Sequence, residues 1–306
     1  MNEKYIELRT RSTFGDIINT YFLFLKHNFK AYTNLYLRYN VISIVLTLIC
    51  SYLLVTGFMG LASRDFRFGM GSNVSSDNYL IAGAIILVLV IFITSLINYS
   101  FSSAYVADYV NNEGAIKSKR IWNSITGNIV SIILFIVIGI LIYIAYGIIS
   151  FIIAFIPLLG FLGRLGLNAI LTAVFGITFM SIFSTKKSIG EAFSEGFDFT
   201  FSKFWRIILY GIVIGILNFV ISGLLVLIPS VLMGIGTYFS VDSGIDIQTS
   251  TTATLFFTLW FAVVLLVFIF TQGLTQLSYG ILYYNLYEMK YNTFLQEKID
   301  QIGVND

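Results

Sequence analysis

The sequence is poor in charged residues. Asp, Glu, Lys and Arg make up 11% of its 306 residues, whereas soluble domains carry about 25%. Hydrophobic residues make up 57% of the chain and the mean hydropathy is +0.86. A soluble fold of this length would not have enough charge to cover its surface. The composition therefore indicates an integral membrane protein.

Histidine and cysteine occur once each, as His27 and Cys50. A single Cys forms no intramolecular disulfide, and one His cannot supply the three or four ligands of a metal site. The sequence also lacks a nucleophile elbow, a phosphate-binding loop or a dinucleotide-binding motif in a suitable context. Paired carboxylates for hydrolysis at the membrane are missing too. We therefore predict no catalytic residue, no cofactor and no metal, and we do not expect an enzyme.

Six long apolar stretches contain no Asp, Glu, Lys or Arg. About 20 apolar residues cross ~30 Å of hydrocarbon, because a helix rises ~1.5 Å per residue. The predicted fold is all-α: a polytopic membrane protein with six transmembrane helices, arranged as three hairpins within one membrane domain over residues 1–306. The spans are predicted over residues 39–62, 79–107, 128–156, 165–183, 207–235 and 253–287.

The basic residues are distributed unevenly between the predicted loops. Fifteen of the 18 Lys and Arg residues lie in the N-terminal segment, the second and fourth connections and the tail, and the other three are Arg64, Arg67 and Arg164. Cytoplasmic loops collect basic residues near helix ends. We therefore predict that the N- and C-termini are both cytoplasmic. The segment before the first predicted span does not have the pattern of a cleavable signal peptide.

Two parts of the sequence match when residues 12–30 are aligned with residues 187–205. The same offset places the second predicted span on the sixth without a gap. We predict an internal repeat with units at 12–110 and 187–287, separated by a middle hairpin at 117–183. Both units begin on the cytoplasmic side, so the repeats would be parallel and not inverted. The alternative is a chance match in Phe-rich sequence. The identical pairs are Gly15 with Gly190, Phe22 with Phe197, Phe24 with Phe199 and Phe29 with Phe204.

The segment before the first span has the pattern of an amphipathic helix. Its apolar residues recur at helical spacing, and Lys26 and Lys30 lie off their face. In the second repeat, Ser188 and Glu191 have the spacing of a capping box. Such a helix beside a span is typical of one that lies in the headgroup plane; the alternative is that it packs against the ends of neighbouring spans. The predicted apolar face comprises Phe14, Ile17, Ile18, Tyr21, Phe22, Leu25 and Phe29.

Polar residues in or beside the spans are the candidate contacts. A basic cluster beside the second amphipathic segment is a candidate for anionic-lipid contact, unless it only enforces the topology. Neutral amides within the spans are expected to join helices by hydrogen bonds; the alternative is that they line a transport path. The basic cluster is Lys186, Lys187, Lys203 and Arg206, and the intramembrane amides are Asn98, Asn168, Asn218, Gln272 and Gln276.

Tyrosine is abundant near the predicted cytoplasmic ends of the second and sixth spans. The uncharged pattern of the sixth span continues over residues 253–287, which is ~50 Å as a helix and more than the hydrocarbon requires. These spans are expected either to tilt strongly or to project into the cytoplasm. A projecting Tyr-rich rim would be a docking surface, and the alternative is an aromatic belt at the membrane surface.

A resemblance to a family rests on three features. They are residues 5–30 (YIELRTRSTFGDIINTYFLFLKHNFK), the six spans that follow, and the later echo SIGEAFSEGFDFTFSKFW. Together they resemble a group of uncharacterised membrane proteins of Bacteroidota, similar to the membrane domain that precedes some glycerophosphodiester phosphodiesterases. The resemblance implies a six-helix bundle in the bacterial cytoplasmic (inner) membrane. The soluble phosphodiesterase domain has no counterpart in residues 288–306.

Two functions are compatible with this sequence. The first is a non-enzymatic accessory or scaffold component that engages lipid or a partner protein at its cytoplasmic face. The alternative is a permease for an apolar or amphipathic solute or lipid, not coupled to ions because the spans carry no charge. The expected partners are membrane lipids and a membrane protein, and no nucleic acid.

Overall fold

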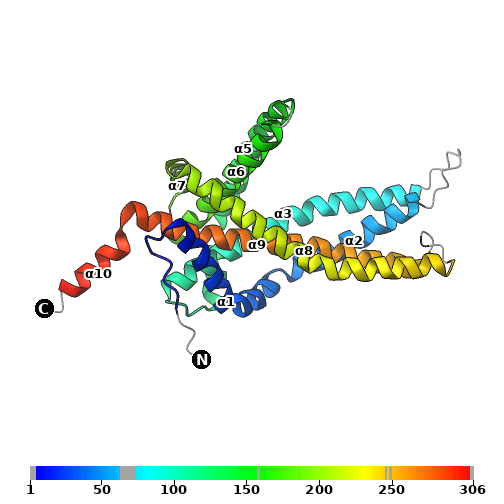
Figure 1. The fold of residues 1–306 in the computed structure, drawn as a ribbon, viewed down its shortest axis with the longest axis horizontal. Coiled ribbons are helices and arrows are strands. Elements are labelled where there is room, and N and C mark those ends of the chain that lie inside the picture. Colours follow the sequence, from blue (N-terminus) through cyan, green and yellow to red (C-terminus); the bar gives the residue numbers. More distant parts are fainter. Residues whose placement is uncertain are drawn as a thin grey trace. The chain divides into compact units, whose positions relative to one another are not determined.

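The computed structural model describes residues 5–62, 74–156, 159–185, 187–244, 247 and 250–303. In this part of the chain the regular structure consists of ten helices and no strand (Figure 1). The helices are α1 (Phe14–Tyr39), α2 (Val41–Ala62), α3 (Val74–Asn111), α4 (Ser118–Gly127), α5 (Ile129–Ala154), α6 (Leu159–Thr185), α7 (Ile189–Ser202), α8 (Phe204–Asp242), α9 (Thr251–Tyr291) and α10 (Thr293–Gly303).

Six of these helices are long and apolar enough to cross a membrane. Each overlaps one of the predicted spans, so the prediction of an all-α polytopic membrane protein is confirmed. A helix with polar residues precedes each apolar pair: α1 precedes α2 and α3, α4 precedes α5 and α6, and α7 precedes α8 and α9. The six apolar segments are Val41–Leu61, Ser76–Asn111, Ile129–Ala154, Gly160–Thr185, Phe204–Asp242 and Thr251–Tyr291.

Close glycine contacts hold α2 and α3 together as an antiparallel hairpin. A Cβ atom at Gly57 would lie 2.6 Å from the side chain of Leu80, and one at Gly83 would lie 2.8 Å from that of Leu54. The small residues therefore let the two backbones approach, as is common between membrane helices. Later residues of α2 meet earlier residues of α3, so the two helices run in opposite directions.

Aromatic side chains join the other two hairpins. Phe135 of α5 meets Phe179 of α6 edge to face, with ring centroids 4.6 Å apart. In the third hairpin, Trp260 Nε1 of α9 donates a hydrogen bond to Ser230 Oγ of α8 at 3.0 Å. The indole N–H thereby gains a partner within an otherwise apolar pair.

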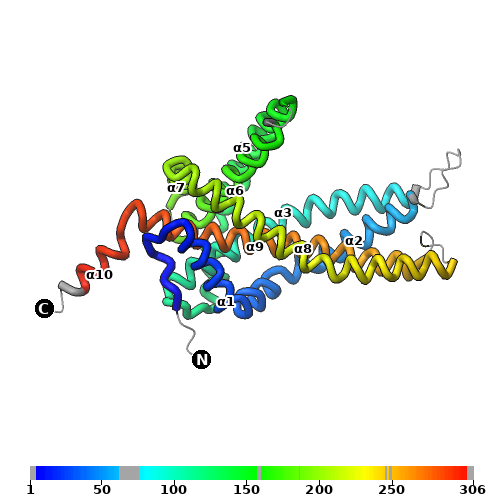
Figure 2. The backbone as a smooth tube through the Cα atoms, viewed as in Figure 1, coloured from blue at the N-terminus to red at the C-terminus, as the bar shows by residue number. Residues whose placement is uncertain are grey.

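Pro229 lies inside α8. A proline removes one backbone N–H from the helix ladder, so the sequence predicts a kink or a helix end there. The helix instead continues to Asp242 (Figure 2). The helix-end alternative is therefore wrong, and a kink at Pro229 stays a prediction. The second proline, Pro157, lies outside the described residues.

Spatial proximity of the Cα atoms divides the chain into two compact units. Unit 1 comprises residues 1–36, 99–216 and 273–306, and unit 2 comprises residues 37–98 and 217–272. Helices α3, α8 and α9 each contribute a long part to both units.

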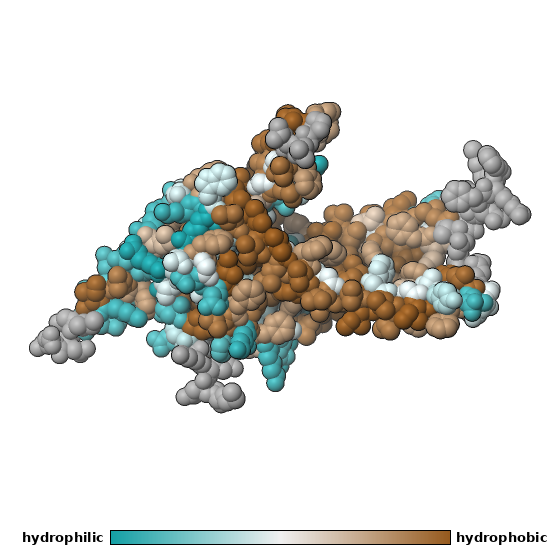
Figure 3. Space-filling model, viewed as in Figure 1, coloured by the Kyte–Doolittle hydropathy of each residue, from teal (hydrophilic) through white to brown (hydrophobic). Residues whose placement is uncertain are grey.

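Unit 2 has a small core and a hydrophobic surface. Its buried cluster is Cys50, Leu54 and Val90, while large apolar side chains such as Val88 and Phe219 are 67% and 78% exposed. Hydrophobic side chains cover most of the visible surface of this unit (Figure 3). Soluble proteins rarely expose apolar patches larger than a few hundred Å², so this surface is suited to lipid.

Unit 1 is built around the second halves of α3, α6 and α9. Residues 101–110 of α3 and 276–286 of α9 are buried without interruption. A Cβ atom at Gly280 would lie 3.1 Å from Val106 of α3 and 3.3 Å from Met180 of α6. The three helices thus converge on Gly280. Because protein surrounds these segments on all sides, their mostly apolar sequence reflects a protein core and does not require lipid contact.

This burial corrects one expectation from the sequence. A Tyr-rich rim was one of two alternatives for the ends of the second and sixth predicted spans. Most of these tyrosines lie inside unit 1 and do not form a docking surface. The buried ones are Tyr105, Tyr109, Tyr279, Tyr283 and Tyr284.

Candidate interfacial surface and intramembrane polar contacts

A capping box starts α7. Ser188 Oγ accepts a hydrogen bond from the Glu191 backbone N–H, and the Ser188 backbone N–H donates to Glu191 Oε2 at 3.0 Å. The predicted capping box is confirmed. The Ser188 hydroxyl and then its backbone N–H lower the pKa of Glu191, because both stabilise the charged carboxylate.

The start of α1, at the beginning of the first predicted repeat unit, has the same arrangement. Thr13 Oγ1 donates to Asp16 Oδ2 at 2.6 Å, and the Thr13 backbone N–H donates to the same oxygen at 3.1 Å. These bonds lower the pKa of Asp16, the side-chain bond having the larger effect. The helices then differ, because α1 continues to Tyr39 whereas α7 ends at Ser202. That the two units superpose as parallel repeats stays a prediction.

Glu195 is the most buried charged group of α7. Its carboxylate accepts hydrogen bonds from Ser181 Oγ of α6 at 2.5 Å and from Tyr283 OH of α9 at 3.2 Å. Lys187 Nζ donates to the other oxygen at 2.5 Å. A buried carboxylate is tolerated when it is paired and fully hydrogen-bonded. These contacts fix α7 against α6 and α9. The sequence analysis missed Glu195, although its place one turn before Phe199 on an apolar face was a usable signal.

A glycine brings α7 even closer to α6. A Cβ atom at Gly196 would lie 2.1 Å from Thr178 Oγ1 and 3.0 Å from the Val174 carbonyl oxygen. Only a residue without Cβ fits at this distance. The helix is therefore held rigidly on its buried side.

Two of the four predicted lipid-contact residues make contacts inside the protein. Lys187 pairs with Glu195 and also faces the rings of Tyr287 and Tyr291, at 5.9 and 5.7 Å from their centroids. Arg206 Nη2 donates to the Ser12 carbonyl oxygen at 2.6 Å.

The Arg206 contact belongs to a larger anchor for the N-terminal segment. Arg206 Nη2 also donates to Asn285 Oδ1 at 3.0 Å, and Asn285 Nδ2 donates to the Thr10 carbonyl oxygen at 2.5 Å. Ile6 N–H donates to Tyr109 OH at 2.9 Å. These bonds tie the chain before α1 to α3, α8 and α9.

Among the described residues of the predicted basic cluster, Lys203 alone is exposed. It occupies the break between α7 and α8. The remaining member, Lys186, lies outside the described residues.

A row of aromatic rings runs past Lys203. The rings of Phe197 and Phe201 stack with centroids 6.2 Å apart, Phe201 stacks on Phe204 at 6.3 Å, and Phe204 meets Trp205 edge to face at 5.4 Å. Phe201 and Trp205 are 55% and 73% exposed. The row leads directly into α8. We refer to these four aromatic residues as the aromatic row.

The exposed face of α1 differs from the face that the sequence predicts. Phe22 and Phe29, placed on the predicted apolar face, are each 47% exposed. They share a stripe with Lys26 and Lys30, at positions i, i+4, i+7 and i+8. The face that packs into unit 1 comprises Ile17, Tyr21, Phe24, Asn28, Tyr32 and Tyr36. Seven apolar positions could be grouped into a helix face in more than one way, and tertiary packing decided which group is buried.

His27 also lies on α1. The sequence predicts no metal-binding role for this residue, and its side chain is exposed in the structure.

Three of the five intramembrane amides join helices. In unit 2, Asn98 Nδ2 donates to the Ile269 carbonyl oxygen at 2.8 Å, and Gln272 Nε2 donates to Ser95 Oγ at 2.8 Å. Both bonds connect α3 to α9, and amides commonly join membrane helices in this way.

The third amide, Gln276, joins three helices in unit 1. Its Nε2 donates to Ser103 Oγ of α3 at 2.8 Å and to the Gly176 carbonyl oxygen of α6 at 3.0 Å. Of the other two amides, Asn168 is exposed and Asn218 is buried.

Asp108 holds α4 in place. Its carboxylate accepts from Arg120 Nε at 2.6 Å and from the Lys117 backbone N–H at 3.0 Å. Both partners lie at the start of α4. Asp108 directly follows the second predicted span, and the structure gives it an ion pair with Arg120 that no spacing rule would indicate.

The described residues contain no group of three His, Cys, Asp or Glu that could hold a metal ion. Their charged side chains connect helices and fix the N-terminal segment. Comparisons of the chain with protein-family models, with curated proteins and with solved structures find no match. The protein is a multipass membrane protein by its six apolar helices.

Proposed function

We propose that the protein is a non-enzymatic scaffold of a bacterial cytoplasmic membrane, which binds anionic lipid through α1 and α7 on its cytoplasmic face. The observation that carries this proposal is the aromatic row beside the exposed Lys203. Aromatic rings that are dry on one side and wet on the other favour the membrane surface. A neighbouring basic residue adds about 1 kcal/mol of attraction to acidic lipid.

The internal anchoring of α7 supports a rigid lipid-binding surface. Glu195 and Gly196 attach the buried side of α7 to α6, while Phe201 near the end of α7 and Trp205 at the start of α8 remain exposed. A preorganised surface loses little conformational entropy when lipid binds. The cytoplasmic orientation rests on the basic loop residues, and the bacterial inner membrane rests on the resemblance.

The interhelical amides favour a scaffold over a permease. A transport path needs polar groups that can face a solute, whereas Asn98, Gln272 and Gln276 donate to other helices. The proposal therefore includes no catalytic turnover and no ion-coupled cycle. A stable protein partner, recovered with the chain from native membranes, would extend the scaffold role.

Retention of defined lipids tests the proposal. The protein would be reconstituted with equal phosphatidylglycerol and phosphatidylcholine, delipidated mildly, and the retained lipids measured by native mass spectrometry. Lys203→Gln should lower phosphatidylglycerol retention about fivefold, corresponding to about 1 kcal/mol, and leave phosphatidylcholine unchanged. The double variant Phe201→Gln/Trp205→Gln should lower retention of both lipids.

The matched controls lie on α10. Lys298→Gln removes one charge, and Leu295→Gln removes one exposed apolar side chain, both away from the aromatic row. Neither should change lipid retention. Equal retention by the wild type and the α7 variants would contradict the lipid-binding role. Proton- or sodium-driven solute uptake by the purified wild type would contradict the scaffold role.

A further inference from the structure

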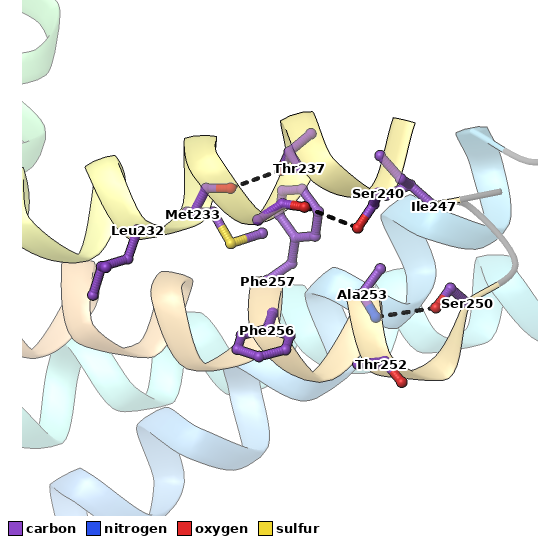
Figure 4. Close-up of a pocket in the computed structure, with 11 residues that line it drawn as sticks. Leu232, Met233, Thr237, Ser240, Ile247, Ser250, Thr252, Ala253, Phe256 and Phe257 are labelled. Atoms are coloured by element: carbon purple, nitrogen blue, oxygen red, sulfur yellow. Dashed lines mark hydrogen bonds between the residues drawn. The ribbon is translucent and has the colours of Figure 1, made fainter. Parts of the chain in front are cut away.

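A cavity of about 220 Å³ lies between the ends of α8 and α9 in unit 2. Figure 4 shows its lining. One wall is formed by α8, the other by the start of α9 together with Ile247 and Ser250. None of the described residues that line the cavity is Asp, Glu, Lys, Arg or His. The lining residues are Leu232, Met233, Gly236, Thr237, Ser240, Ile247, Ser250, Thr252, Ala253, Phe256 and Phe257.

The hydroxyl groups of the lining are occupied mainly within their own elements. Thr237 Oγ1 donates to the Met233 carbonyl oxygen at 2.9 Å, and Ser240 Oγ donates to the Gly236 carbonyl oxygen at 2.9 Å. On the facing wall, Ser250 Oγ accepts from the Ala253 backbone N–H at 3.3 Å (Figure 4). Polar groups that already have hydrogen-bond partners do not need a further hydrogen bond from a ligand. The cavity therefore favours an apolar occupant over water.

The surroundings of the cavity indicate which apolar molecule reaches it. Most of the lining belongs to two candidate membrane spans, Phe204–Asp242 and Thr251–Tyr291, and Leu232 and Phe256 are 65% and 61% exposed beside the opening. Exposed apolar side chains of membrane spans face the acyl chains of the surrounding lipid. The cavity therefore opens toward lipid chains.

We infer that this cavity binds one acyl chain of a membrane phospholipid. An apolar cavity of ~150 Å³ is large enough to stay dry and to bind a benzene-sized molecule, and this cavity is larger. A chain segment that leaves the surrounding lipid would fill it without losing any hydrogen bond. The site goes beyond the lipid-binding role of α1 and α7 and does not depend on it, because it involves different helices and different residues.

Gly236 provides a variant that fills the cavity. A Cβ atom at Gly236 would meet nothing within 4 Å, so Gly236→Leu places its side chain in open space. Gly234, also on α8, has equally open surroundings but does not line the cavity. Gly234→Leu is therefore a matched control with the same change in size and helix propensity. Ala253→Leu fills the cavity from the α9 side as a second variant.

The probe is a phosphatidylcholine with a photoactivatable diazirine in one acyl chain, incorporated into detergent-free nanodiscs with the full-length protein. After irradiation, labelled peptides would be mapped by mass spectrometry. Labelling of Met233 and Phe257 would be normalised to that of Phe219, which is 78% exposed outside the cavity. We expect normalised labelling to fall several-fold in Gly236→Leu and in Ala253→Leu, and to stay unchanged in Gly234→Leu.

Three results would overturn the inference. One is wild-type protein that is labelled at Phe219 but not in the cavity. Another is labelling that stays the same in both cavity-filling variants. The third is labelling that falls equally in Gly234→Leu, which would indicate a general effect of larger side chains on α8. Each variant must be monodisperse and have the helicity of the wild type before its labelling is compared. If one cavity-filling variant does not fold, the other one alone tests the inference. None of these results bears on lipid retention by α7.

Discussion

The two parts of α3 are both mostly apolar in sequence but have different surroundings. Residues 81–92 in unit 2 present large apolar side chains to the outside, whereas residues 101–110 in unit 1 are completely buried. The same difference separates the two parts of α9. Hydropathy measures only how poorly a segment dissolves in water, and both lipid and protein core satisfy that requirement.

Packing detail distinguishes the two units. Unit 1 contains a paired buried carboxylate and glycines that admit no Cβ atom, as a protein core does. Unit 2 also has close glycines between α2 and α3, at Gly57 and Gly83, but its glycines on α8 have open surroundings. Substitutions of one type should therefore have large effects in the core of unit 1 and small effects on the α8 part of unit 2.

The largest effect is expected from Lys187→Met in unit 1. The substitution leaves the buried Glu195 carboxylate without its cation, and loss of one partner from a buried pair costs about 3–5 kcal/mol. Because the Lys187 side chain is 27% exposed, water compensates in part, and we expect about 2–3 kcal/mol. Unfolding in denaturant would measure the loss. Lys298→Gln on α10 serves as a control, and an equal loss there would contradict this explanation.

Gly196→Ala and Gly223→Ala should have opposite signs. The added methyl group meets Thr178 at 2.1 Å in the first case and nothing within 4 Å in the second. Overpacking typically costs about 1–3 kcal/mol, whereas Gly→Ala in an unhindered helix stabilises by up to about 1 kcal/mol. Thermal unfolding of both variants in the same lipid would compare them. A stabilised Gly196→Ala would show that α7 and α6 are farther apart than described.

The amides provide a smaller comparison. Gln276→Leu breaks bonds to two helices inside unit 1 and leaves the Gly176 carbonyl oxygen without this donor, so we expect a loss of about 1–3 kcal/mol. Gln272→Leu in unit 2 removes the bond donated to Ser95 and the bond accepted from Asn98; bonds of this kind contribute about 0.6 kcal/mol each in a membrane protein. Denaturant unfolding would measure both variants. A larger loss for Gln272→Leu would reverse the expected order.

The smallest effect concerns pH. The folded-state pKa values of Asp16 and Glu191 are lower than their ordinary values of 3.8 and 4.5. Each cap therefore stabilises its helix fully above those ordinary values and loses this contribution as the pH falls through the folded-state pKa. Hydrogen exchange in the first turn of α7, corrected for intrinsic rates, should lose protection in this range. Ser188→Ala should remove the pH dependence; its persistence would point to another group.

The sequence was sufficient to predict the six apolar helices, the hairpins and the capping box of α7. Each follows from a local pattern: long apolar stretches, short connections, and the spacing of Ser188 and Glu191. It did not predict which apolar face of α1 is buried, because Phe22 and Tyr21 both fit an apolar face and tertiary packing chose between them. The pairs Glu195–Lys187 and Asp108–Arg120 depend on how segments come together in space, which no helical spacing specifies.

The central claim is that the second halves of α3 and α9 lie in a protein core and not in contact with lipid. The most direct test labels the reconstituted protein with a freely diffusing apolar carbene reagent and maps the modified residues. We predict modification within residues 81–92 and 255–268, and none within residues 101–110 and 276–286. Equal modification of all four segments would contradict the account, because the second halves would then face the hydrocarbon as ordinary spans.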